Sequence, residues 1–186
     1  IKLFIARIIT LIPPFFTLGI PITWALVNID QIMKGFDIDL INLTIRSFGL
    51  GLLVAITTII ISLILSNSKR WQNLKLLNLL TFLSGIGYAI PGSVLALSLL
   101  SLNGNNWQIN TLCLLIWGYS IRFLAVSKGG LDAAFERISP NIDNAATNLG
   151  RSWPEVFYKI HLPLLKGPIL VGSLLVFVDT LKELPL

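Results

Sequence analysis

The side chains that could do chemistry are few, and three of them stand together near the end of an apolar run. Asp179, Lys182 and Glu183 are spaced at i, i+3 and i+4, so a helix over residues 164–181 would bring them to one face. Carboxylates at that depth could help a cation to pass, whereas Lys182 could simply form an internal salt bridge. Covalent catalysis would need a partner base or metal ligands beside Asp179 and Glu183, and the sequence supplies none. We therefore expect no enzyme.

Metal, redox and nucleotide chemistry also lack their usual residues. His161 is the single histidine and Cys113 the single cysteine. We interpret His161 as an ordinary loop residue beside Pro163, and Cys113 as a small apolar side chain. No cluster of Cys and His with metal-site spacing occurs, and no Gly-x-x-x-x-Gly-Lys-Ser/Thr sequence for ATP is present. We expect this chain to bind no metal and no cofactor.

The composition indicates lipid as the main solvent. Hydrophobic residues make up 54% of the 186 residues and charged residues 12%, against about 25% charged in soluble domains. The net charge of +5 could favour nucleic acid. However, the basic residues flank apolar runs, which is how membrane proteins set their orientation. We expect lipid contact and no nucleic-acid partner.

Five apolar stretches are long enough to cross a bilayer, which takes about 20 residues as a helix. They predict an all-α, polytopic transmembrane helical bundle that forms one domain over residues 1–186. Pro91 and Gly92 interrupt the third stretch, and such a break either lines a cavity or is a kink filled by neighbours. The chain starts without Met and stops inside an apparent element, so we expect a fragment truncated at its C-terminus. The five stretches are 8–27, 47–66, 76–102, 109–126 and 164–181.

Charge in the connections predicts the orientation of these spans. Connections rich in Lys and Arg alternate with acidic or uncharged ones, which predicts a cytoplasmic start and an external end. By the same reasoning, Arg122 should lie near the cytoplasmic interface, with its long side chain reaching towards water. The basic residues are Lys2, Arg7, Lys69, Arg70, Lys75, Lys128, Arg137, Arg151 and Lys159, and the acidic ones are Asp30, Asp37 and Asp39.

The polar segment 127–163 is patterned as two short helices. Ser139 is a good N-cap, and Gly150 stands where a helix C-cap glycine belongs. A capping box begins at Ser152 and starts the second helix, which we expect Pro163 to end. Such a pair outside the membrane is either a rigid handle that docks on a cytosolic partner or a plain connecting loop.

A gapped pattern in this segment resembles a known family. It reads Asn144-Ala145-Ala146, three residues, Gly150, nine residues, then Ile160-His161-Leu162-Pro163. This is similar to the Glu-Ala-Ala loop of ABC importer permeases, the inner-membrane components of binding-protein-dependent transport, with Asn144 in place of Glu. The resemblance implies that the loop couples the spans to a cytosolic ATPase dimer, which binds the ATP and Mg²⁺. The implied ATPase-coupling residues are Asn144, Ala145, Ala146, Gly150, Ile160, Leu162 and Pro163.

Three further stretches, 87–96, 119–125 and 177–185, resemble the ferric-iron branch of this family, and specifically the C-terminal half of such a permease. With the loop, the resemblance covers most of residues 85–186. It implies a bacterial inner-membrane location, a second permease half or copy, and a periplasmic or extracellular binding protein that delivers iron. The residues that we expect along the translocation path are Pro91, Gly92, Asp179 and Glu183.

Other cargoes and one other mechanism stay open at this point. Similar permeases handle thiamine, polyamines or small inorganic ions. A secondary transporter is the mechanistic alternative, but such proteins often carry inverted repeats, and we find no internal repeat in this sequence.

Overall fold

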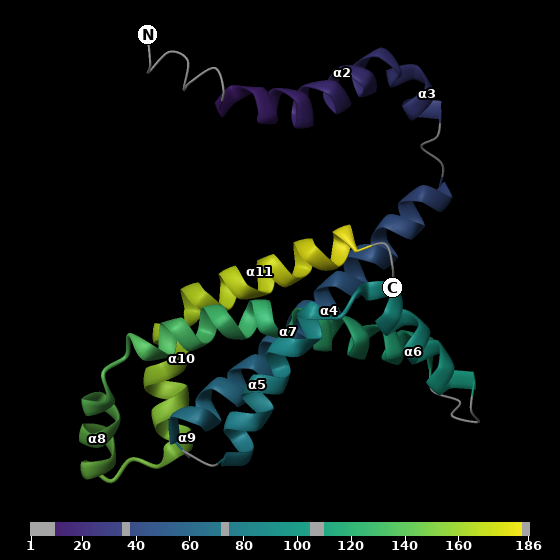
Figure 1. The fold of residues 1–186 in the computed structure, drawn as a ribbon. Helices are drawn as coiled ribbons and strands as arrows, with labels where there is room; N and C mark the ends of the chain where they lie inside the picture. The colour runs from purple at the N-terminus through teal and green to yellow at the C-terminus, as the bar shows by residue number, and fades with distance from the viewer. Residues whose placement is uncertain (1–9, 35–37, 72–74, 105–109, 184–186) are drawn as a thin grey trace. The chain divides into compact units, whose positions relative to one another are not determined.

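The computed structural model describes residues 10–34, 38–71, 75–104 and 110–183, and over these ranges all regular structure is helical (Figure 1). This confirms the predicted all-α class. The chain forms two compact units, Ile1–Arg46 and Ser47–Leu186. Several predictions fall outside the described residues. They concern Lys2, Arg7, Asp37, the span ends at 8 and 109, and positions 184–185.

The first unit carries one apolar helix that is long enough to cross a membrane, Thr10–Val27. Its turns are η1 (Phe15–Gly19), a π-helix, and α2 (Ile20–Val27), and α3 (Ile29–Lys34) follows. Pro21 occupies the first turn of α2, where its missing N–H costs little. Thr17 Oγ1 donates to the carbonyl of Pro13 at 2.8 Å, a contact that threonine commonly makes with the preceding helical turn.

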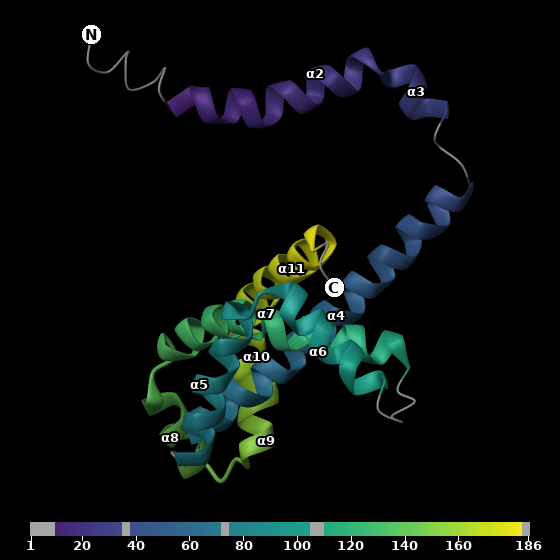
Figure 2. The same ribbon diagram turned by 45° about the vertical axis from the view of Figure 1, so that its right-hand side comes forward.

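Three long helices build the core of the second unit. They are α4 (Ile38–Trp71), α7 (Thr111–Glu136) and α11 (Lys166–Lys182). Figures 1 and 2 show α7 and α11 side by side. The buried side chains between the three helices are Val54 and Ala55 of α4, Tyr119 and Phe123 of α7, and Val176 of α11.

Small polar residues lie buried along one face of α4, and one hydroxyl pair links α4 to α7. Thr58, Ser62 and Ser66 follow one another at i, i+4 and i+8 along α4, and all three are buried. The hydroxyls of Thr57 and Ser120 lie 2.9 Å apart across the two helices. Small and hydroxyl-bearing residues are the ones that membrane helices place at their contacts. The outward faces carry large apolar side chains, as lipid-facing surfaces do.

The third predicted span is broken where the sequence indicated. Helix α5 (Lys75–Ala89) ends before Pro91, and α6 (Gly92–Gly104) leaves it at an angle of 106°. Proline lacks the N–H that would continue the ladder, which accounts for the break. Three described helices can each cross a membrane by length and composition, or up to five spans form if each of two bent pairs counts as one.

The fourth span is longer than predicted, and the polar segment is correspondingly shorter. Helix α7 continues past Val126 to Glu136, so Ser127 is not a helix boundary. A short link then leads to α8 (Pro140–Asn148), α9 (Trp153–Val156), the π-helix η2 (Phe157–His161) and α10 (Leu162–Leu164). Residues 137–165 are called the helical loop below.

Pro163 does not end the second helix, contrary to our expectation. The Leu162 N–H donates to the carbonyl of Phe157, five residues back, which makes the π-turn of η2. This wider turn resets the hydrogen-bond ladder, so Pro163 falls in the first turn of α10, where proline is tolerated. The direction changes later, at Leu165, where the chain bends by 71° into α11.

Candidate functional site

The first helix of the helical loop is closed at both ends by its own residues. The Ser139 side chain accepts a hydrogen bond from the Asn141 N–H at 3.3 Å. At the other end Gly150 has φ of +75°, the left-handed conformation that glycine adopts without strain. The Gly150 N–H donates to Thr147 O and the Arg151 N–H to Ala146 O, which is the Schellman arrangement. The predicted N-cap and C-cap are confirmed.

The second helix begins with the predicted capping box. The Ser152 N–H donates to the Glu155 carboxylate at 3.3 Å, and both halves of the box are present. Glu155 also pairs with Arg151 and Lys159 on the surface. Together the caps define two short, rigid helices joined at Gly150.

The helical loop keeps a large part of its apolar surface outside. Leu149 is 81% exposed and Trp153 43%, and Ile142 is also exposed. Among the residues of the gapped pattern, Ala146 is buried and Ile160 and Leu162 are half-buried. The exposed members are Asn144, Ala145, Gly150 and Pro163. Some residues of the pattern therefore pack inside the protein, and others lie on its surface.

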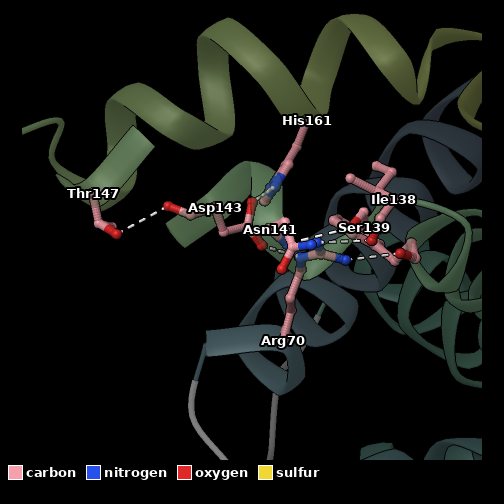
Figure 3. Close-up of polar contacts among 8 residues, drawn as sticks. Arg70, Ile138, Ser139, Asn141, Asp143, Thr147 and His161 are labelled. Atoms are coloured by element: carbon pink, nitrogen blue, oxygen red, sulfur yellow. Dashed lines mark hydrogen bonds and ion pairs between the residues drawn. The ribbon is translucent and has the colours of Figure 1, made fainter. Parts of the chain in front are cut away.

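A polar cluster that the sequence did not predict joins the loop to the bundle (Figure 3). Arg70, at the end of α4, donates through Nε to Asp143 Oδ2 at 2.5 Å. His161 Nε2 lies 2.7 Å from the other oxygen, Asp143 Oδ1. The His161 side chain is fully buried. His161 lies in the loop beside Pro163 as interpreted, but its burial and its contact with Asp143 were not predicted.

The same guanidinium also caps α7. Arg70 Nη1 donates to the carbonyl of Phe135 at 2.8 Å and Nη2 to that of Ile138 at 2.9 Å. These carbonyls lie at the helix end, where partners within the helix run out. The Phe135 ring meets the imidazole of His161 edge to face, with 5.5 Å between the ring centres. Four segments of the second unit thus meet at Arg70, Asp143 and His161.

A signal for this cluster was present in the sequence. Asp143 stands three residues before the buried Ala146, so helical spacing already puts both on the inner face of α8. A carboxylate on an inner face requires a cationic or hydrogen-bonding partner. Which partner it takes depends on how α4 and α7 end, and spacing along the sequence does not give that.

A second charged cluster lies halfway along α7. Arg122 Nη2 pairs with Glu183 Oε1 at 3.1 Å, and Nη1 donates to the carbonyl of Ile90 at 3.2 Å. Arg122 was expected at the cytoplasmic interface. That expectation stays a prediction. Within α7, which extends to Glu136, Arg122 lies near the middle of the helix, and its side chain is largely buried.

The three ionisable residues at the end of α11 take different partners. Lys182 Nζ lies 3.8 Å from Asp179 Oδ1, as the salt-bridge interpretation predicted. Glu183 is the C-cap residue of α11, and its carboxylate pairs with Arg122. Arg122 therefore contacts two groups from the expected path, the Glu183 carboxylate and the Ile90 carbonyl just before Pro91. Asp179 is not part of this cluster.

The break between α5 and α6 is pressed against α7. A Cβ added at Gly87 would lie 2.3 Å from the carbonyl oxygen of Ile121. This close approach brings the Ile90 carbonyl within reach of Arg122. Gly92 is buried at the break and Pro91 is exposed.

We compared the sequence of this chain with known protein families. Residues 58–186 match the family model of the binding-protein-dependent transport system inner membrane component. The match covers more than half of the chain. The chain belongs to this family. A comparison with curated proteins found no matching relative.

The protein is therefore a permease subunit of an ABC importer, embedded in a membrane by several helices. The family is one of transport and not of catalysis. The match begins at Thr58 and so includes both charged clusters of the permease. In the part of the permease that the structure describes, no group of three or more His, Cys, Asp and Glu side chains could hold a metal ion.

Proposed function

We propose that this permease subunit imports ferric iron delivered by an external binding protein, and that a cytosolic ATPase dimer drives it through the helical loop. The proposal includes a second permease half or copy and a bacterial inner-membrane location. ATP and Mg²⁺ bind in the ATPase partner. One observation supports the coupling role: a loop with two capped helices leaves apolar side chains exposed, Leu149 and Trp153 among them.

The docking surface that we propose consists of Ile142, Leu149 and Trp153. A leucine that is 81% exposed on a capped helix gains little from the permease itself. Burying it in a groove of a partner would contribute about 1.5–3 kcal/mol. The exposed Asn144 and Ala145 on the same helix would lie at the contact, with Gly150 fixing the angle to the second helix.

Copurification of the ATPase subunit tests this surface. Leu149→Asp should lose the ATPase from the purified complex, because the charge would have to be desolvated in the groove. Asn148→Asp, one residue earlier and also exposed, adds the same charge without removing an apolar contact and serves as the control. Equal ATPase recovery with both variants would contradict the docking proposal.

The cargo proposal rests on the resemblance of residues 87–96, 119–125 and 177–185 to ferric-iron permeases. The cluster of Arg122, Glu183 and the Ile90 carbonyl supports a path beside the helix break, because it places charge near the middle of α7. Ionisable groups at membrane depth are costly and are usually functional. Pro91, Gly92, Asp179 and Glu183 remain the residues that we propose for the path.

Uptake of radiolabelled ferric iron tests the cargo. Glu183→Gln removes the charge that Arg122 neutralises, and Asp179→Asn removes one that is paired with the exposed Lys182. We expect a larger loss of uptake for Glu183→Gln, with ATP hydrolysis still stimulated by the loaded binding protein. Uptake of thiamine, a polyamine or an inorganic anion by the unaltered complex, without uptake of iron, would replace iron as the cargo.

A further inference from the structure

We propose that Arg70, Asp143 and His161 are positioning residues, which form a joint that holds the helical loop in a fixed orientation to α4 and α7. When the helical loop moves, α4 and α7 then move with it, because the connection between the loop and the two helices does not bend. This inference rests on the proposed coupling function of the loop. The joint itself consists of contacts within one compact unit.

Helix α8 has few other attachments to the bundle. Ala146 is its one buried residue, and its remaining side chains apart from Asp143 are exposed. An apolar cluster of Phe135, Ile138 and Leu165 holds the two ends of the helical loop. Apolar contacts are not directional, so they keep the ends together without fixing how α8 is turned. Charge-assisted hydrogen bonds do fix a direction.

Asp143 is suited to the centre of the joint because it has two oxygens. One accepts from Arg70 and the other lies against His161, so α4 and η2 are attached to α8 by a single side chain. A carboxylate only accepts hydrogen bonds, so His161 donates through Nε2. His161 Nδ1 is buried and has no partner among the described residues. The orientation of the ring therefore depends on Asp143 and on its packing against Phe135.

Arg70 extends the joint to α7. Its flat guanidinium offers several N–H groups in a fixed fork, and here they reach Asp143, Phe135 O and Ile138 O at once. A lysine has one ammonium and could not span these three acceptors. The end of α7, the start of α8 and the end of α4 should therefore move as one body.

The histidine allows a matched pair of variants. In glutamine the amide nitrogen is as many bonds from the backbone as Nε2 of histidine, so His161→Gln can still donate to Asp143. Asparagine places its amide at the position of Nδ1, so His161→Asn falls short. Both variants remove the ring, so a loss of folding through lost packing alone would affect the two alike.

The experiment measures loop orientation and coupling separately. Spin labels at Lys69→Cys in α4 and Asn148→Cys in α8, both exposed, report the distance between the helices in a Cys113→Ser background. Substrate-stimulated ATP hydrolysis of the assembled complex reports coupling. Glu155→Gln is the control, because glutamine also completes a capping box and this exposed residue does not contact the joint.

We expect a narrow distance distribution for the unaltered permease, His161→Gln and Glu155→Gln, and a broad one for Asp143→Asn and His161→Asn. Stimulated hydrolysis should fall about tenfold in the latter two, since one hydrogen bond to a charged group is worth about that in an equilibrium. The amount of bound ATPase should not change. Unchanged distributions in Asp143→Asn and His161→Asn, or equal broadening in His161→Gln and His161→Asn, would overturn the joint. Failure of the unaltered permease to bind an ATPase would instead refute the proposed function, because the spin-label result needs no partner.

Discussion

Replacing Gly87 with alanine tests how tightly the broken span packs on α7. The new Cβ would stand 2.3 Å from the Ile121 carbonyl oxygen and 3.1 Å from the Cγ2 of the same residue. Since real Cβ contacts do not fall below 3.0 Å, α5 and α7 must separate by about 0.7 Å. The obstacle is backbone, which cannot rotate away as the tip of a side chain can.

Overpacking of this kind costs about 1–3 kcal/mol, and a backbone obstacle places Gly87→Ala at the upper end of that range. For a chain of this size the apparent melting temperature should fall by about 5–10 °C. The assay is thermal unfolding of the purified permease in one detergent. The separation should also weaken the 3.2 Å contact between Arg122 and the Ile90 carbonyl, three residues along from Gly87.

Gly85→Ala provides the matched control. It lies on the same helix, is exposed, and nothing is within 4 Å of its added Cβ. Alanine has a higher helix propensity than glycine by about 1 kcal/mol, so Gly85→Ala should melt at the same temperature or slightly higher. If Gly87→Ala melts no lower than Gly85→Ala, the close contact of α5 and α7 is wrong.

Three further predictions concern the two clusters and the loop. Gly150→Asp should abolish uptake while leaving membrane insertion intact, because φ of +75° strains any side chain by about 1–2 kcal/mol and tilts the second helix; uptake assays and membrane fractionation measure this. Arg122→Gln should lower the melting temperature more than the double variant Arg122→Gln with Glu183→Gln, since the single change leaves a carboxylate without its partner; a double-mutant cycle should give a coupling of about 0.5–3 kcal/mol, and additive effects would contradict the pair. Ser139→Cys in a Cys113→Ser background should react with an impermeant thiol reagent only from the cytosolic side, and labelling of intact cells from outside would reverse the proposed topology.

Local features of this chain could be predicted from its sequence. The caps at Ser139, Gly150 and Ser152 depend on residues within a few positions of one another, and all three formed as predicted. The break at Pro91 follows in the same way from the missing N–H. The fold class followed from apolar runs of bilayer length.

The pairings between helices could not be predicted. Helical spacing grouped Glu183 with Asp179 and Lys182, but it could not show that Glu183 pairs with Arg122 on another helix. Hydropathy ended the fourth span at Val126, although the polar residues after it continue the helix to Glu136.

The expectation that Pro163 ends the second helix was wrong because of the turn that precedes it. A proline in a helix is a stop signal unless the preceding turn widens, and the π-turn at Phe157–His161 is such a wider turn.

The contact between Arg70 and Asp143 joins two segments that are 73 positions apart in the chain. Such contacts depend on tertiary packing, which one sequence read in windows does not contain.

Helix α7 is continuous, and polar contacts attach it to the rest of the unit at two places, one near its middle and one at its end. Arg122 holds the helix to the broken span and to Glu183, while the carbonyls of Phe135 and Ile138 are held by Arg70. The thirteen helical steps from Arg122 to Phe135 span about 20 Å at 1.5 Å per residue. Tilting the rod by about 10° around Arg122 would carry its far end about 3 Å, more than a hydrogen bond of 2.8 Å can stretch. A small rotation of α7 about Arg122 is therefore enough either to move α4 through Arg70 or to break the hydrogen bonds that Arg70 donates.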